Sequence, residues 1–285
     1  MPPLVSVLTP SLNQARWLPD NLQSVASQSY RQIEHVVMDG SSTDGSVDIL
    51  RAIRRPRFIW RSERDEGQAQ ALNKAFAASS GEIIGWLNSD DAYFSPTVVA
   101  EVVDHFQQNP ESDVVYGHGA LVNADGVILH LMWSPRYRAS LLPLLNFISQ
   151  PTAFIRRRAI EARFVDESFQ HVMDRELWLR LSARHRFSRL QRIVAIDRHQ
   201  AARKGYVQRD VAARENRRLA AMYGIPAGIS ADAWRKTLKI LIRLRGIGIV
   251  GLARPPHAFQ AHHDGLAALV LRQAIVPRRL MATGD

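Results

Sequence analysis

The amino-acid sequence predicts an α/β fold, with a mostly parallel sheet flanked by helices and a helical extension at the C-terminal end. Short apolar runs typical of buried strands alternate with segments whose apolar residues recur at helical spacing. Three of the predicted strands end in Asp, Asn, Ser or Thr. Because ligands bind at the carboxyl ends of strands in open α/β sheets, this pattern also predicts where the functional site lies.

The predicted elements follow one another at short intervals. Strands are expected at 4–9, 33–38, 58–60, 83–87, 113–116, 150–157 and 193–196, where apolar residues dominate. Helices are expected at 18–26, 47–53, 69–78, 174–185 and 211–222, where apolar residues share one face or charged residues dominate. Ser95-Pro96 is typical of a further helix start, and Asp125-Gly126 predicts a hairpin turn within 122–127.

Composition limits the classes of function. The 285 residues are 46% hydrophobic and 22% charged, as in globular proteins, and none is Cys, which excludes disulfides, thiolate metal ligands and a Cys nucleophile. The first residues lack the pattern of a secretory signal. No apolar run approaches the roughly 18 residues that a membrane-spanning helix needs. We therefore expect a cytoplasmic protein.

The net charge of +10 is concentrated near the C-terminal end. Residues 206–285 carry 13 Lys and Arg against 5 Asp and Glu, a net charge of +8, whereas residues 1–205 carry 24 against 22. We therefore expect a body at 1–205 and a basic helical extension at 206–285. Within 234–245, apolar residues at helical spacing lie among cations. This pattern predicts either a helix on an anionic membrane, at the inner face of the cell membrane, or a helix docked on the body.

The stretch from Glu82 to Asp91 carries the first functional signal. A buried strand is predicted to run directly into Asn88-Ser89-Asp90-Asp91. Adjacent carboxylates repel each other unless a cation or a hydrogen-bond donor lies between them. Oxygen ligands at this density suit Mg²⁺ or Mn²⁺ bound together with a phosphate-bearing substrate. Taken alone, however, two Asp favour a solvated turn with a helix cap, so the interpretation depends on the other strand ends.

The strand at 33–38 supplies the second signal. It is followed at 39–45 by the loop Asp-Gly-Ser-Ser-Thr-Asp-Gly, which can offer backbone N–H groups and hydroxyls to a nucleotide. The loop matches neither the Walker pattern Gly-x-x-x-x-Gly-Lys-Ser/Thr nor the dinucleotide pattern Gly-x-Gly-x-x-Gly. Helix capping by Thr43 or Asp44 explains part of the loop but leaves Asp39 unexplained.

Together these blocks resemble the family 2 glycosyltransferases, which have the Rossmann-like GT-A fold and bind nucleotide sugars. The likeness covers about the first 200 residues and includes 5–14, 28–30, 34–45, 65–67, 72–74, 81–84 and 88–90. Asn88-Ser89-Asp90 stands at the place of the family's Asp-x-Asp metal motif, with Asn in place of the first Asp. The resemblance implies an inverting transfer of sugar from a nucleoside diphosphate sugar, in cell-surface polysaccharide or glycolipid synthesis.

The resemblance also implies roles for individual residues. The donor would contact Pro10, Ser11, Asn13, Asp39, Asp65, Lys74, Asn88, Ser89, Asp90 and His199. Asp90 would bind Mg²⁺ or Mn²⁺ with Asp91 beside it, and the uncharged Asn88 would lower the affinity for the ion. Asp174 would act as the general base. Its position in the sequence alone favours a helix N-cap, but the family has its base in a similar block. Arg198-His199 would lie near the diphosphate.

Two classes of function remain open at this point. The first is a transferase whose acceptor is a saccharide or a lipid-linked saccharide. The second is a non-catalytic nucleotide- or nucleic-acid-binding protein that uses the basic tail. Few aromatic residues lie among the cations of the tail and no nucleic-acid-binding module is recognised, so no nucleic-acid partner is expected. A dehydrogenase is disfavoured because the glycine fingerprint is missing.

Overall fold

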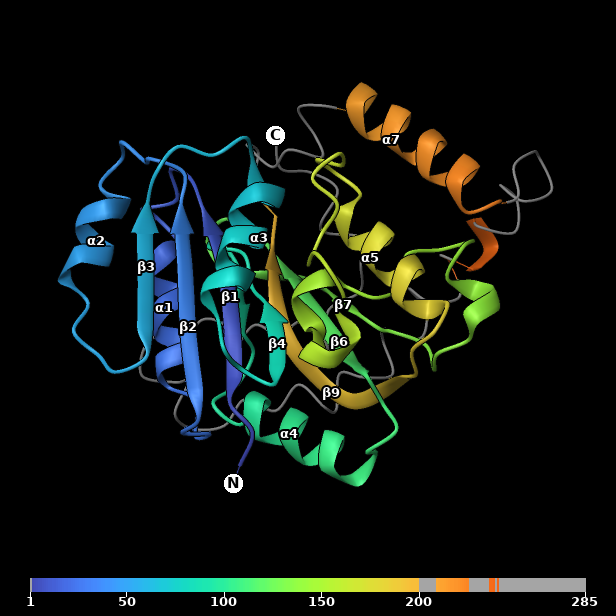
Figure 1. Ribbon diagram of the computed structural model, residues 1–285, viewed down its shortest axis with the longest axis horizontal. Helices are drawn as coiled ribbons and strands as arrows, with labels where there is room; N and C mark the ends of the chain where they lie inside the picture. Colours follow the sequence, from blue (N-terminus) through green and yellow to red (C-terminus); the bar gives the residue numbers. More distant parts are fainter. Residues whose placement is uncertain (1, 200–208, 226–235, 239, 241–285) are drawn as a thin grey trace.

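The computed structural model describes residues 2–199, 209–225, 236–238 and 240 (Figure 1). Within them, nine strands form one sheet in the order β3-β2-β1-β4-β8-β6-β9-β5, with β7 paired to β6. The strands are β1 (Val5–Ser11), β2 (Ile33–Asp39), β3 (Phe58–Ser62), β4 (Ile83–Trp86), β5 (Ala92–Tyr93), β6 (Val114–Val122), β7 (Ile128–Met132), β8 (Ala153–Arg156) and β9 (Phe187–Arg198). The helices are α1 (Leu18–Ala26), α2 (Ser46–Ala52), α3 (Gln68–Ala78), α4 (Val98–Gln108), α5 (Met173–Ser182) and α7 (Arg209–Met222). The predicted α/β class is confirmed.

The four strands at one end of the sheet are parallel. β1 pairs with both β2 and β4, and β2 pairs with β3, all in the same direction. These strands read as nearly continuous apolar runs because they are covered on both faces, and every residue of β1 is buried. Ser11 pairs with Asp39, which pairs with Ser62. The polar residues at these strand ends therefore meet at one edge of the sheet, as the sequence predicted.

The rest of the sheet is mixed. β8 runs antiparallel between β4 and β6, whereas β6 and β9 are parallel. An antiparallel strand starts where its neighbour ends, so the short 3₁₀ helix Gln150–Thr152 before β8 lies beside the end of β4. There the Gln150 side chain donates from Nε2 to the carbonyl of Trp86 at 2.5 Å. The antiparallel insertion thus brings a distant segment to the polar edge.

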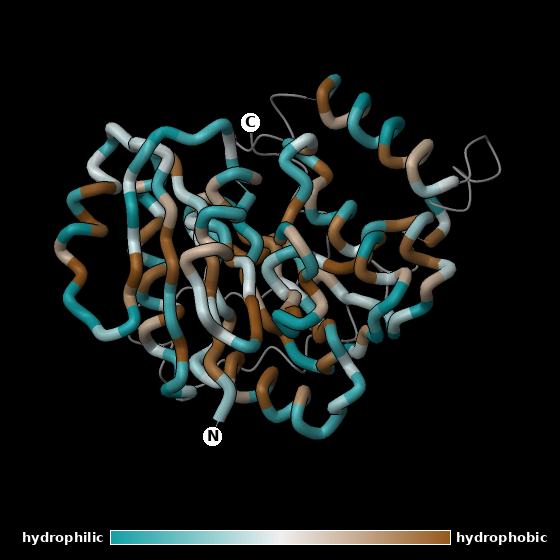
Figure 2. The backbone as a smooth tube through the Cα atoms, in the orientation of Figure 1, coloured by the Kyte–Doolittle hydropathy of each residue, from teal (hydrophilic) through white to brown (hydrophobic). Residues whose placement is uncertain are grey.

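Helices cover both faces of the sheet. On one face, β-strand residues such as Leu8 and Ile84 pack in one apolar cluster with residues of α3, α5 and α7. On the other face, Val7 and Ile83 pack against residues of α1 and α4. Alternate residues of a strand point to opposite faces, which explains this division. Figure 2 shows the hydrophobic residues concentrated in the central strands, with hydrophilic residues along the loops above them.

Local starts and ends of elements differ from the sequence prediction in three places. α4 begins at Val98 instead of at Pro96, because Ser95 is buried and its hydroxyl lies 3.0 Å from the Thr97 hydroxyl instead of capping the helix. Asp174 is the second residue of α5, not its N-cap, which is Val172. β9 already starts at Phe187, because the half-buried and exposed residues at 188–192, most of them polar, lack the apolar run that predicted the strand at 193–196. The predicted hairpin at 122–127 is confirmed, with Gly126 at φ 82°.

The first part of the basic extension packs on the body. Leu219 of α7 and Ile225 beyond it are buried in the same cluster as α5 (Figure 1). Residues 236–238 and 240 are helical, and the rest of the stripe predicted at 234–245 lies outside the described residues. In the part of the chain that the structure describes, no helix has the length and apolar character needed to cross a membrane.

Candidate active site

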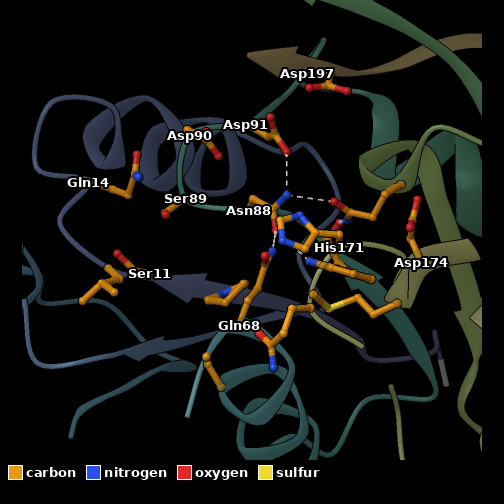
Figure 3. A pocket seen from close by; sticks show the side chains of 18 of the residues that line it. Ser11, Gln14, Gln68, Asn88, Ser89, Asp90, Asp91, His171, Asp174 and Asp197 are labelled. Carbon is orange, nitrogen blue, oxygen red and sulfur yellow. Dashed lines mark hydrogen bonds between the residues drawn. The ribbon is translucent and has the colours of Figure 1, made fainter. Parts of the chain in front are cut away.

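A cavity of about 640 Å³ opens at the polar edge of the sheet (Figure 3). Its walls come from the ends of β1, β4 and β9, from the start of α3, from the segment 170–174 that leads into α5, and from α7. The predicted site residues that line it are Pro10, Ser11, Asn13, Asp65, Asn88, Ser89, Asp90, Asp91 and Asp174. Figure 3 shows Ser11 and Ser89 toward one side and Asp174 toward the other, with Asn88 and His171 between them.

Three predicted residues lie away from the cavity lining. Asp39 is buried at the end of β2, where its carboxylate accepts hydrogen bonds from the Ser42 N–H (2.9 Å) and the Ser62 hydroxyl (2.7 Å). Lys74 on α3 pairs with Glu63 at 2.7 Å. The His199 N–H donates to the Val122 carbonyl at 2.7 Å, which extends the β6–β9 pairing. In this structure, their contacts lie within the protein framework around the cavity.

The loop after β2 supports the loop after β1. Asn13, at φ 53°, accepts the Thr43 N–H with its side chain at 2.9 Å and donates its own N–H to the Ser42 hydroxyl at 2.7 Å. The Ala15 N–H donates to Asp44 at 2.8 Å. Since Ser42 is itself held by Asp39, the loop at 39–45 sets the position of Asn13 at the cavity wall.

The side chain of Asn88 is bonded through both of its polar atoms. Its Oδ1 accepts from Gln68 Nε2 (2.7 Å) and Trp86 Nε1 (2.8 Å), and its Nδ2 donates to Gln150 Oε1 (2.9 Å) and Asp91 Oδ2 (3.2 Å). The indole N–H can only donate, which fixes the orientation of the amide. A primary amide has two N–H donors and one oxygen with two lone pairs, and all four are used here. The structure therefore requires a donor at this position, which Asp would not supply.

Asp91 ties the end of β4 to the end of β9. It is 3% exposed, and its oxygens accept from the Arg198 N–H (3.0 Å) and from Asn88. The Arg198 guanidinium, also buried, donates to the carbonyls of Asp90 (2.9 Å) and Ala124 (3.2 Å) and to the carboxylate of Asp20 (2.8 Å). Asp91 and Arg198 thus hold the backbone around Asp90. Both residues line the cavity, where the sequence predicted Asp91 beside a metal ion and Arg198 near the diphosphate.

The acidic groups at the cavity fit a metal ion that arrives with its substrate. Among the residues that the structure describes, no group of three or more His, Asp or Glu side chains converges as a complete metal site. Asp90 is half-buried and lines the cavity beside Asn88 and Asp91. Mg²⁺ commonly takes one or two protein carboxylates and completes its shell with phosphate oxygens and water. The donor set around Asp90 fits that mode of binding.

Asp174 has an environment suited to a base. It is half-buried near the start of α5, and its Oδ2 accepts a hydrogen bond from Asn146 Nδ2 at 2.9 Å. Burial raises the pKa of the Asp174 carboxyl above its ordinary value, and the hydrogen bond from Asn146 offsets part of that rise. A carboxylate with a raised pKa is a stronger base.

The fold is that of the GT-A glycosyltransferases. The backbone resembles S. aureus TarS 1-349 in complex with UDP-GlcNAc, with a TM-score of 0.59 and 18% identity over 77% of this chain and 71% of that one. It also resembles a mannosyltransferase from Pyrobaculum calidifontis in complex with GDP-Man and Mn²⁺, with a TM-score of 0.59 and 18% identity over 96% and 79% of the two chains. At these identities the likeness concerns the fold.

The chain belongs to glycosyltransferase family 2. Residues 6–164 match the family profile described as Glycosyl transferase family 2. An uncharacterized glycosyltransferase of Mycobacterium tuberculosis is 37% identical over 128 residues, which are 44% of this chain and 49% of that protein. A PGL/p-HBAD biosynthesis glycosyltransferase of Mycobacterium bovis is 32% identical over 118 residues, 40% of this chain and 46% of that protein. The chain thus spans about half the length of these relatives.

We expect Asn88→Asp to destabilise the fold. The carboxylate would lose both donated hydrogen bonds and face Asp91 Oδ2 and Gln150 Oε1, at a cost of about 1–3 kcal/mol in the free energy of unfolding. Mg²⁺ or Mn²⁺ should recover part of this loss, since a cation can lie between the two carboxylates. Urea unfolding with and without the ion measures both effects.

Asn123→Asp is the matched control for this prediction. Its Oδ1 accepts two backbone hydrogen bonds in the hairpin turn, from Asp125 at 3.0 Å and Val127 at 2.9 Å, which a carboxylate preserves. Equal stability of the wild type and Asn88→Asp would contradict the requirement for a donor at position 88.

Proposed function

We propose that the protein transfers a sugar from a nucleoside diphosphate sugar to an acceptor hydroxyl, in the synthesis of cell-surface polysaccharide or glycolipid. The observation that carries the proposal is a single cavity whose walls include both Asp90, at the end of β4, and Asp174, near the start of α5. One carboxylate would serve the leaving diphosphate and the other the incoming hydroxyl. Membership of glycosyltransferase family 2 supports this assignment.

The donor would bind at the ends of β1 and β4. Ser11, Asn13 and Ser89 line the cavity there. The Ser11 hydroxyl is buried and has no hydrogen-bond partner within the described residues. Buried polar groups are nearly always bonded, so a ligand is the expected partner. Asp39 and Lys74 would act through the loops that they hold, since their own bonds are to protein groups.

Asp90 would hold Mg²⁺ or Mn²⁺ together with the diphosphate. When bound, the ion would stabilise the negative charge that develops on the leaving group. Arg198 supports this assignment, since its guanidinium donates to the Asp90 carbonyl and fixes the backbone that carries the carboxylate. Asp91 would lie beside the ion, since each of its oxygens accepts one hydrogen bond within the protein and keeps a further lone pair.

Asp174 would act as the general base of a single displacement. Its carboxylate takes the proton of the acceptor hydroxyl while that oxygen forms a bond to the anomeric carbon. The bond from the anomeric carbon to the diphosphate breaks in the same step, and the anomeric configuration inverts. The raised pKa of Asp174 favours proton uptake from a weakly acidic hydroxyl. Asn146, which donates to Asp174, would orient the carboxylate.

The acceptor would be a saccharide or a lipid-linked saccharide. The net charge of +8 in residues 206–285 supports a peripheral contact with an anionic membrane surface, where a lipid-linked acceptor is found. Part of this segment is α7, which packs on the body, so the membrane contact would involve residues beyond it.

A screen of UDP-sugars and GDP-sugars for thermal stabilisation tests the proposal. Binding raises the stability of the folded state by RT ln(1 + [L]/Kd), so the correct donor should raise the melting temperature. The rise should be larger with Mg²⁺ or Mn²⁺ than with a chelator. A single-stranded oligonucleotide belongs in the same screen. Stabilisation by the oligonucleotide and by no nucleotide sugar would favour the alternative, a non-catalytic nucleic-acid-binding protein that uses the basic tail.

A further inference from the structure

We propose that Glu215 of α7 is a positioning residue for Asp174. The inference rests on the proposed function, since it takes Asp174 as the base. The segment 170–172 leads into α5 and lines the cavity next to Asp174. Glu215 lies more than 40 positions further along the chain, within the range in which the sequence predicted only a basic extension.

The carboxylate of Glu215 accepts hydrogen bonds from three consecutive backbone N–H groups. Its Oε1 accepts from Gln170 (2.8 Å), and its Oε2 accepts from His171 (2.8 Å) and Val172 (3.3 Å). The side chain is buried, with 9% of the residue exposed. Hydrogen bonds from N–H groups to a carboxylate are stronger than those to neutral acceptors. One side chain of α7 therefore fixes the backbone just before α5.

The N-cap position of α5 carries no polar side chain. The residue there is Val172, and no side chain caps the helix at that position. Ser, Thr, Asp or Asn usually supplies an oxygen at such a position. Negative charge is also favoured near a helix N-terminus, where the backbone N–H groups point outward. Glu215 supplies both the oxygens and the charge from a different helix.

Further contacts of α7 and of Tyr223, the residue after it, hold the other side of Asp174. Arg175 donates to the Asn216 side chain at 2.6 Å, and the Tyr223 hydroxyl donates to Glu176 at 3.0 Å. The residues before and after Asp174 are thus both bonded to this part of the chain, and Asn216 itself lines the cavity. Figure 1 shows α7 beside α5 at the rim of the molecule. Loss of the hydrogen bonds between Glu215 and the segment 170–172 should move Asp174 relative to the donor and leave the ends of β1 and β4 in place.

The test compares Glu215→Gln with Asp210→Asn, which removes an exposed carboxylate from the same helix. Gln keeps the volume of the side chain but offers one acceptor oxygen, and its NH₂ group faces backbone donors. In Glu215→Gln, the amides of 170–172 should exchange hydrogen about tenfold faster. Turnover should fall by about tenfold or more, because small misplacements of a reacting group are costly. The Kd for UDP or GDP should stay within about twofold of the wild type, and Asp210→Asn should match the wild type.

Glu215→Asp provides a second variant if Glu215→Gln does not fold. It keeps the charge but draws the carboxylate back by one methylene, so the same division between turnover and nucleotide binding is expected. Unchanged exchange at 170–172, or turnover equal to that of Asp210→Asn, would overturn the proposal. Asp174→Asn, measured in parallel, separates the claims. If it is fully active, the base assignment fails and the role of Glu215 with it; if it is inactive beside a fully active Glu215→Gln, only the role of Glu215 fails.

Discussion

Asp174→Asn should lower the turnover of sugar transfer by roughly 10²–10⁴-fold while nucleoside diphosphate binding is retained. The amide keeps the shape of the side chain and can still meet the Asn146 side chain, but it cannot accept a proton at neutral pH. Asp174 is the second residue of α5 and not its N-cap, and Asn keeps a hydrogen-bonding side chain there, so only a small loss of helix stability is expected. Steady-state transfer kinetics and a nucleotide titration of both forms measure the two quantities.

The pH profile of the wild type gives a second observation on the same residue. A base must be ionised, so turnover should fall as the pH is lowered through the pKa of Asp174 in the donor complex. Since burial raises that pKa, the fall should occur above the ordinary value for Asp, about 3.9.

Asp197→Asn, at another acidic residue of the cavity wall, is the control for Asp174→Asn. An active Asp174→Asn beside an inactive Asp197→Asn would assign the base to Asp197 instead.

Asp90→Ala should abolish transfer and weaken the binding of nucleoside diphosphate in the presence of Mg²⁺ or Mn²⁺. The reason is that Asp90 lines the cavity and contributes a carboxylate to the proposed metal set. Calorimetric titration with UDP and GDP, with the ion and with a chelator, measures the effect. In the wild type the affinity should depend on the ion, and in the variant this dependence should be lost.

Asp91→Asn separates the roles of the two adjacent Asp residues. The NH₂ group of the new amide would face a donor, either the Arg198 N–H or the Asn88 NH₂ group, so the main effect should be a lower melting temperature.

Full activity of Asp90→Ala, or of the wild type in excess chelator, would contradict the metal assignment. If a well-folded Asp91→Asn loses metal-dependent binding of nucleoside diphosphate, Asp91 is itself a ligand of the ion.

Local sequence patterns were sufficient to predict the alternating elements and the edge of the sheet that carries the site. Asp90 follows an apolar run that could only be a buried strand, so its position was predictable from its own neighbourhood. The strand order beyond β4 was not, because the apolar run that forms β8 does not say which strands it lies between. That antiparallel insertion delivers Gln150 to the site.

The residues that the sequence did not indicate are those whose partners lie far away in the chain. Gln68 and Gln150 meet at Asn88, and an uncharged amide has no periodicity or motif to mark it. Glu215 was concealed for a different reason: its neighbours include several Arg residues, so a count of charges registers only a basic helix. Its three backbone partners become visible only when α7 is placed against the segment 170–172.

The anomeric configuration of the transfer product tests the central claim most directly. That claim is a single displacement in which one protein carboxylate, Asp174, removes the acceptor proton on the cavity wall across from the donor. The coupling constant of the anomeric proton, read by NMR in product formed from a nucleotide sugar of known configuration, gives the answer. The account predicts inversion, so an α-linked donor should yield a β-linked product. Retention of the donor configuration would contradict it.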